Sequence, residues 1–246
     1  MAETLLALVS GHLLADFIIQ TEWMVRNKRK LWVMLLHITS VIAITAVLLG
    51  TWNWPVLLTI LGTHLLMDAI KAHLLKDTFH AFAVDQAFHI AVLIALAYLI
   101  PDAAAAGWWS TAPPNLYAAY CAALSLICGT IVSLVVGGII IHLLTKPMLD
   151  GFDKVIEGLP KGGLYIGWLE RALVMLLILI NQPTGVGFLV AAKSILRFGE
   201  VTNAEQRKAV EYIIIGTFMS FGWGLLIAIL TQRVSSHWVS MIHQIF

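Results

Sequence analysis

Histidine and aspartate recur four residues apart in two apolar segments of this 246-residue chain. His12 and Asp16 lie in the segment GHLLADFI, and His64 and Asp68 lie in THLLMDAI. On an α-helix, this spacing places two side chains on one face, about 6 Å apart along the axis. Imidazole nitrogens and carboxylate oxygens are ligands that zinc, manganese and iron accept. Each pair therefore predicts two ligands directed at one site.

The similarity between the two segments extends to a third histidine. His37 follows the first histidine by twenty-five residues, and His89 follows the second by the same interval. This recurrence predicts a tandem duplication of a two-helix unit. Asp85, four residues before His89, has no counterpart in the first copy, where Val33 stands. We therefore expect two similar hairpins that form one unsymmetrical cluster.

Ionisable side chains within a membrane are costly, and they persist mainly where they face a bundle interior. The pattern favours a divalent metal site, with zinc, manganese or iron as the candidate ions. A proton relay and a set of structural hydrogen bonds are the alternatives. The predicted catalytic residues are Asp68 and Asp85, and the predicted metal ligands are His12, Asp16, His37, His64, Asp68, Asp85 and His89.

The composition is that of a polytopic membrane protein. Hydrophobic residues make up 60% of the chain and charged residues 12%, and the mean hydropathy is +0.89. Several apolar runs approach the length of about 20 residues that a membrane-spanning helix needs. The formal net charge of +1 gives no reason to expect a nucleic-acid partner. We expect an all-α bundle of seven or eight transmembrane segments.

The connections between apolar runs differ in charge. Residues 26–30 read RNKRK, and the connection after residue 70 also carries lysines, whereas residues 101–115 contain neither lysine nor arginine. The positive-inside rule then places the basic connections in the cytoplasm and the N-terminus outside. Because no basic stretch precedes the first apolar run, we expect it to be a retained helix, not a cleaved signal peptide. The expected helices are 3–24, 31–49, 55–75, 82–100, 116–144, 164–180, 185–198 and 210–230, with an unplaced tail after residue 231.

Two regions are expected. Residues 1–100 form the duplicated four-helix bundle, with its His and Asp cluster in the cytoplasmic half, and residues 101–246 form a second helical region. In this second region Glu170 and Arg171 are adjacent, and Lys193 and Arg197 are four apart. One interpretation is a Glu170–Arg171 ion pair with basic anchors at helix ends. The other is an anion-binding site formed by Lys193, Arg197 and Arg171.

The motifs GHLLADFIIQTEWM, THLLMDAIK and DQAFH, followed by IGWLERAL and AAKSILRF, resemble an uncharacterised bacterial integral-membrane family, domain of unknown function 3307. This resemblance covers nearly the whole chain and implies a multi-pass protein of the bacterial inner membrane. The His and Asp pattern is also similar to small bacterial membrane proteins described as metal-dependent hydrolases.

These observations lead to three functional hypotheses. The first is a metal-dependent hydrolase that lies among membrane lipids. Its substrate is a phosphate or ester of a membrane lipid or prenyl carrier. The second is a transporter or channel for metal ions or protons that uses the same residues. The third is a membrane scaffold with a structural metal.

Overall fold

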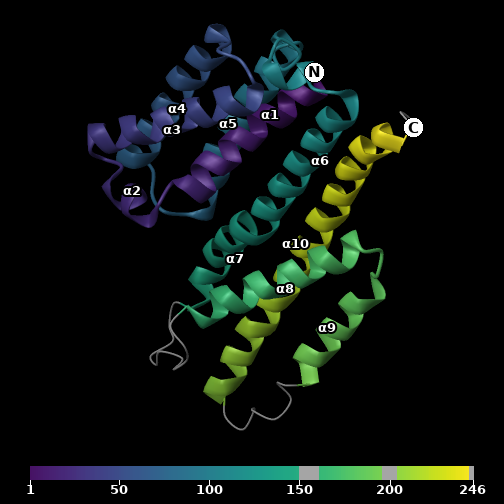
Figure 1. The fold of residues 1–246 in the computed structure, drawn as a ribbon. Coiled ribbons are helices and arrows are strands. Elements are labelled where there is room, and N and C mark those ends of the chain that lie inside the picture. The colour runs from purple at the N-terminus through teal and green to yellow at the C-terminus, as the bar shows by residue number, and fades with distance from the viewer. Residues whose placement is uncertain (150–160, 196–203, 244–246) are drawn as a thin grey trace. The chain divides into compact units, whose positions relative to one another are not determined.

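The computed structural model describes residues 1–149, 161–195 and 204–243, and every regular element in these ranges is helical (Figure 1). Two five-residue segments, η1 and η3, are π-helical, and η2 and η4 are short 3₁₀ helices. The elements are α1 Ala2–Leu14, η1 Ala15–Ile19, α2 Glu22–Asn27, α3 Leu31–Leu49, α4 Trp54–Leu74, α5 Phe79–Leu99, η2 Trp108–Thr111, α6 Pro114–Ile131, η3 Val132–Val136, α7 Gly137–Thr145, η4 Lys146–Leu149, α8 Gly162–Leu179, α9 Thr184–Ile195 and α10 Ala204–His243.

Seven helical stretches are long and apolar enough to cross a membrane: 2–19, 31–49, 54–74, 79–99, 114–148, 162–179 and 210–242. This confirms the predicted all-α, multi-span fold. α9 has 12 residues, which is short for a span of about 20. The last span is longer than the predicted 210–230, because α10 continues without a break through the polar residues that follow Leu230.

The first span is shorter than predicted. The helix ends at Ile19, where Gln20 adopts an extended conformation with ψ 101°. Thr21 then caps α2, its side chain accepting a hydrogen bond from the Met24 amide at 3.3 Å. A threonine at this position satisfies one of the amides that the first helical turn leaves unpaired. The basic segment at residues 26–30 is therefore presented by a separate short helix.

The chain forms two compact units, Met1–Cys128 with Val234–Phe246, and Gly129–Arg233. In the first unit α1 packs against α3 and α5, and α4 packs against the same two helices (Figure 1). Leu8, Val41, Ile60 and Leu93 contribute one buried side chain from each of these four helices. The core of the predicted 1–100 region is thus a four-helix bundle, and the unit extends beyond residue 100.

The connection after α5 folds onto the ends of α1 and α3. The Thr4 hydroxyl donates to the Pro101 carbonyl at 2.6 Å and accepts from the Ala104 amide at 3.1 Å. Gly50 ends α3 with a φ of 78°, in the left-handed region that glycine tolerates, and its carbonyl accepts from the Trp108 amide at 2.8 Å. These bonds fix one end of the bundle.

In the second unit, η3, α7 and α9 all pack against α8. The Trp223 indole donates to the Val132 carbonyl at 3.0 Å, and the Gln232 amide donates to the Ile178 carbonyl at 2.8 Å. Met175, Ile178 and Ala228 form a small buried cluster. This unit therefore has a core of its own.

The order of spans predicts which connections share a side of the membrane. Asn27 follows one span and Ala105 follows four, so single cysteines at these positions, with Cys121 and Cys128 replaced by alanine, should react from opposite sides. The positive-inside rule places position 27 in the cytoplasm. The measurement is labelling of whole cells and opened vesicles with a membrane-impermeant thiol reagent.

A cysteine at Trp52, which follows two spans, serves as the control and should label from the same side as position 105. If external reagent reaches position 27 and spares position 105, the orientation is the reverse of the one we expect. Labelling of positions 27 and 105 from the same side would contradict the four-span bundle itself.

Candidate metal centre

The predicted site residues form two adjacent layers across the four-helix bundle of the first unit. Each histidine lies four residues, about one turn, from one of the buried apolar residues Leu8, Val41, Ile60 and Leu93. The histidine layer contains His12, His37, His64 and His89, all at most 3% exposed. One turn further lies a layer of Asp16, Val33, Asp68 and Asp85. The four-residue spacing seen in the sequence thus produces three successive layers in the bundle: an apolar layer, an imidazole layer and a carboxylate layer.

Four atoms of these layers lie close enough together to be candidate ligands of one metal ion. The two Nε2 atoms of His37 and His64 are 3.2 Å apart. Asp16 Oδ1 lies 3.4 and 3.5 Å from these nitrogens, and Asp68 Oδ2 lies 3.6 and 3.5 Å from them. Ligands at about 2.0–2.1 Å from a tetrahedral ion are about 3.3–3.4 Å from one another. The five distances are therefore compatible with two histidines and two aspartates that could hold one divalent ion.

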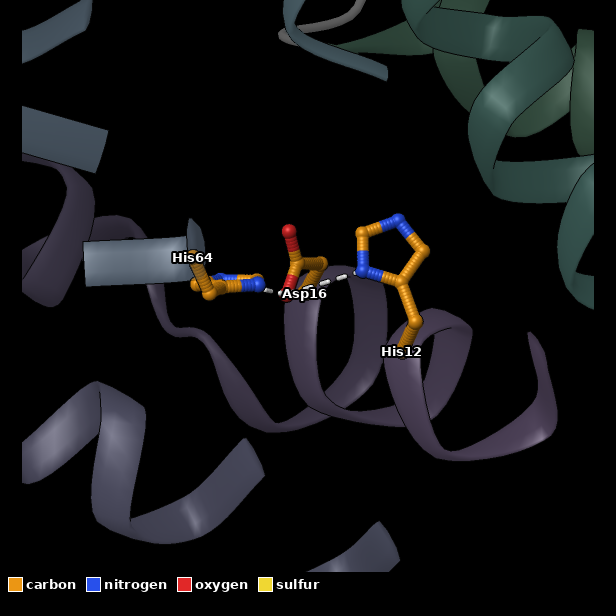
Figure 2. Close-up of side chains that lie close together, drawn as sticks. All are labelled: His12, Asp16 and His64. Carbon is orange, nitrogen blue, oxygen red and sulfur yellow. Dashed lines mark ion pairs between the residues drawn. The ribbon is translucent and has the colours of Figure 1, made fainter. Parts of the chain in front are cut away.

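Figure 2 shows how Asp16 is placed for this role. Its carboxylate lies between the rings of His12 and His64, and dashed lines join it to both. The Asp16 Oδ1 to His12 Nδ1 distance is 3.7 Å. Asp16 belongs to η1, and π-helical turns are frequent at functional sites because they change the direction of a side chain within a helix.

The carboxylate oxygens that face the histidines lack hydrogen bonds. Asp16 Oδ1 and Asp68 Oδ2 are buried and have no hydrogen-bond partner, and neither does Asp85 Oδ1. An unpaired buried carboxylate oxygen is costly, and buried charges are normally paired or bound to metal. The cluster could therefore hold a cation.

Two lysines hold the outer oxygens of the carboxylate layer. Lys28 Nζ lies 2.7 Å from Asp68 Oδ1, and Lys71 Nζ lies 2.5 Å from Asp85 Oδ2. In each aspartate, the lysine contacts the carboxylate oxygen that is not directed at a histidine. Such outer contacts orient metal ligands and tune their charge. Lys28 and Lys71 are therefore positioning residues of the cluster.

A second group of side chains lies beside the four candidate ligands. Asp85 Oδ1 is 3.5 Å from His89 Nε2, and the His89 ring stacks on that of His64 with centroids 4.1 Å apart. Gln86 donates to Asp85 Oδ2 at 2.9 Å, and its Oε1 is 3.2 Å from His12 Nε2. Asp68, Asp85 and His89 also offer ligand atoms within 4.8 Å of one another. The seven predicted ligands thus gather in one cluster, as the sequence analysis expected.

A small cavity of about 10 Å³ adjoins the histidine layer on its apolar side. Its lining includes His12, His64 and His89 together with Leu8 and Ile60. This volume is about that of one water molecule. On the other side of the cluster the Lys71 side chain is 36% exposed, so the cluster approaches the surface through the carboxylate layer.

Sequence reasoning missed three residues of the cluster: Lys28, Lys71 and Gln86. The two lysines were interpreted only as markers of the cytoplasmic side, although Lys71 is three residues after Asp68 and so lies on a neighbouring part of the helix surface. Gln86 directly follows Asp85 in the motif DQAFH. The signal for Lys71 was available, whereas the contact of Lys28 depends on the separate helix α2.

The predicted features of the second unit are arranged differently. Glu170 of α8 forms an ion pair with Lys193 of α9, and it also acts electrostatically on its predicted partner Arg171. The Lys193 ammonium also lies 5.9 Å from the centre of the Phe221 ring. Arg171 is buried and donates to Ser220 Oγ and to the Leu134 carbonyl, each at 2.9 Å. The predicted partner Arg197 lies outside the described residues.

These observations describe a helical protein with seven segments able to cross a membrane, which suggest a multi-pass membrane protein, and with a buried cluster of histidine and aspartate between the first four. Residues 4–114 match the family described as "Protein of unknown function (DUF3307)". The match confirms the resemblance seen in the sequence. It covers the segment that carries the whole cluster, whereas we expected the resemblance to cover nearly the whole chain. No curated protein and no solved structure matches the chain.

Lys28 provides a test of the cluster. Replacing it with methionine leaves the Asp68 charge buried without its ammonium partner, a change that costs about 3–5 kcal/mol when one member of a buried ion pair is removed. We expect a markedly lower melting temperature of Lys28→Met in detergent with chelator present. Lys30→Met is the control, because Lys30 belongs to the same basic segment but is exposed.

The second substitution Asp68→Asn, made in the Lys28→Met background, should recover part of the lost stability, since it removes the unpaired charge. If the Lys28→Met variant is as stable as the Lys30→Met control, the Lys28–Asp68 contact does not stabilise the folded protein.

Proposed function

We propose that the protein binds one divalent metal ion at Asp16, His37, His64 and Asp68, and that it is a membrane hydrolase that uses this ion. The observation that carries the metal site is the set of five distances between 3.2 and 3.6 Å among the four ligand atoms. A donor set of two imidazoles and two carboxylates suits zinc, manganese or iron.

The formal charge of the cluster supports a single ion. Asp16, Asp68 and Asp85 contribute three negative charges, and Lys28 and Lys71 contribute two positive charges, so the sum with neutral histidines is −1. One divalent ion changes this sum to +1, whereas two ions would give +3. Because net charge in a low-dielectric interior is costly, one ion fits the described residues better than two.

The residues outside the four ligands support hydrolytic chemistry. A bound divalent ion supplies Lewis-acid activation of a water molecule, and zinc sites can expand to five ligands to admit it. Asp85 Oδ1 has no hydrogen-bond partner and faces the cluster, while Lys71 and Gln86 hold its other oxygen. This arrangement lets Asp85 act as the general base. Asp68, the other residue predicted to be catalytic, is assigned here as a ligand.

The depth of the cluster suggests the substrate class. The ligands lie within four membrane spans, and their carboxylate layer is on the side of the basic residues Lys28 and Lys71. A substrate that reaches this level from the bilayer would carry its ester or phosphate close to the polar boundary of the membrane. A lipid or prenyl carrier with such a group fits this position.

The metal site predicts a clear difference between two histidines of α4. His64→Ala should reduce bound metal from about one ion per chain to a small fraction, because it removes one of four ligands. His73→Ala, which changes an exposed histidine of the same helix, should leave metal content unchanged. Elemental analysis of the purified protein measures both.

His37→Ala should behave as His64→Ala does, and the double variant should lose hardly more, since the two residues act on the same ion. Equal metal content in wild type, His64→Ala and His73→Ala would rule out the proposed ligand set.

The hydrolase proposal makes a separate prediction for Asp85. Asp85→Asn should retain the metal ion but lose at least about a hundredfold in turnover, the lower range of what a general base contributes. The measurement is release of inorganic phosphate from phosphatidic acid, and of fatty acid from phosphatidylglycerol, in mixed micelles with metal-loaded protein. Asp77→Asn, in the exposed loop before α5, is the control.

If metal-loaded wild-type protein releases neither product, and a phosphorylated prenyl carrier is also left intact, hydrolysis is not the function. The metal site would stand, because its own measurement is independent of turnover.

The two lysine–aspartate pairs favour a second candidate function, transport of a metal ion or protons. In the Lys28–Asp68 and Lys71–Asp85 pairs an entering cation could displace a lysine from a buried aspartate, and ionisable groups within spans often mark ion pathways. Reconstituted vesicles distinguish the two: metal-dependent ion uptake that Asp85→Asn abolishes would favour transport over hydrolysis.

A further inference from the structure

Arg171 of α8 is a buried cation in the second unit, and the proposed metal centre does not use it. Its side chain is 2% exposed within a membrane-spanning helix. Its Nη1 donates to Ser220 Oγ and its Nη2 donates to the Leu134 carbonyl, each at 2.9 Å. Both acceptors are neutral, so these bonds orient the guanidinium without balancing its charge.

Among the described residues, no carboxylate forms an ion pair with Arg171, although Glu170 acts on it electrostatically. Its sequence neighbour Glu170 is paired with Lys193, and these three side chains together carry a net charge of +1. The Nε–H of Arg171 is buried and has no hydrogen-bond partner. Isolated charges in this position are rare, because buried arginines are almost always paired.

A second orphaned group lies on the adjoining segment. Ser133 Oγ is fully buried without a partner, one residue before the Leu134 carbonyl that Arg171 contacts. Ser133 belongs to η3, which packs against α8. The described part of this unit thus contains two unpaired polar groups on two elements in contact. Neither has another side chain to satisfy it.

Three glycines let helix backbones approach the Arg171 side chain closely. A Cβ atom at Gly167 would lie 3.0 Å from Arg171 Nη1, and one at Gly138 would lie 3.2 Å from Nη2. A Cβ at Gly224 would lie 3.2 Å from Arg171 Cγ. These glycines come from α7, α8 and α10, so three helices provide close backbone walls around one cation.

We propose that Arg171 forms the centre of an oxyanion site, which takes a phosphate group at the guanidinium edge that carries Nε. Arginine is suited to oxyanions, because its planar fork presents parallel N–H donors to two oxygens. The phosphate comes either from a lipid headgroup or from free phosphate. The Ser133 hydroxyl is a further unpaired donor on the adjoining segment. This site does not depend on the metal centre or on hydrolysis.

The test measures how phosphate affects the melting temperature of full-length protein in detergent, with chloride at equal ionic strength as the reference. Phosphate should raise the melting temperature of the wild type by several degrees at saturation. Arg171→Gln should weaken phosphate binding by about tenfold or more, because it removes a charged donor. Arg26→Gln, an exposed arginine on α2, should respond as the wild type does.

The same comparison in nanodiscs identifies the source of the phosphate. Stabilisation by phosphatidic acid over phosphatidylcholine, lost in Arg171→Gln, assigns the site to a headgroup, and stabilisation by free phosphate alone assigns it to a solute.

If Arg171→Gln does not fold, a second variant replaces it. Arg171→Lys keeps the charge but loses Nε, and it should bind phosphate more weakly than the wild type. Wild type that responds equally to phosphate and chloride, or variants that keep the full phosphate response, would overturn the proposal. Metal content, measured on the same samples, tests the metal centre independently.

Discussion

The low dielectric constant of a membrane interior means that each buried charge needs a counter-charge within a few ångströms. In the first unit this requirement applies to Asp16, Asp68 and Asp85. Lys28 pairs with Asp68, and Lys71 pairs with Asp85. Asp16 contacts only histidines among the described residues, at 3.4 to 3.7 Å. It is thus the one of the three without a lysine partner, and it is also one of the four proposed ligands.

The packing of the bundle brings this carboxylate to its place. A Cβ atom at Gly11 would lie 2.7 Å from Thr45 Oγ1, so glycine is what lets α1 approach α3 closely just before His12. The π-helical turn η1 then directs Asp16 toward the histidines of α3 and α4. Because the apolar layer of Leu8, Val41, Ile60 and Leu93 holds the helices in register, a short motif on each helix is enough to assemble the cluster.

The sequence predicted the parts of this structure that follow from periodicity. The four-residue spacing of His12 and Asp16, repeated in His64 and Asp68, and the twenty-five-residue interval to His37 and His89 drew attention to the residues that the structure brings together. The apolar runs indicated the helical spans that carry them. The tandem duplication remains a prediction. Periodicity could not reveal that the first helix ends at Ile19, because the break depends on the local capping of α2 by Thr21. It could not assign Lys28 to Asp68 either, since that contact joins residues forty positions apart through tertiary packing.

The same physical argument distinguishes the two units. In the first, the described buried carboxylates outnumber the lysines that pair with them, so the residual charge is negative and the unpaired atoms are oxygens. In the second, the charges of Glu170, Arg171 and Lys193 sum to +1, and the unpaired groups among the described residues, Arg171 Nε and Ser133 Oγ, can donate hydrogen bonds. The proposed cation would balance the first residual charge, and the proposed oxyanion would balance the second.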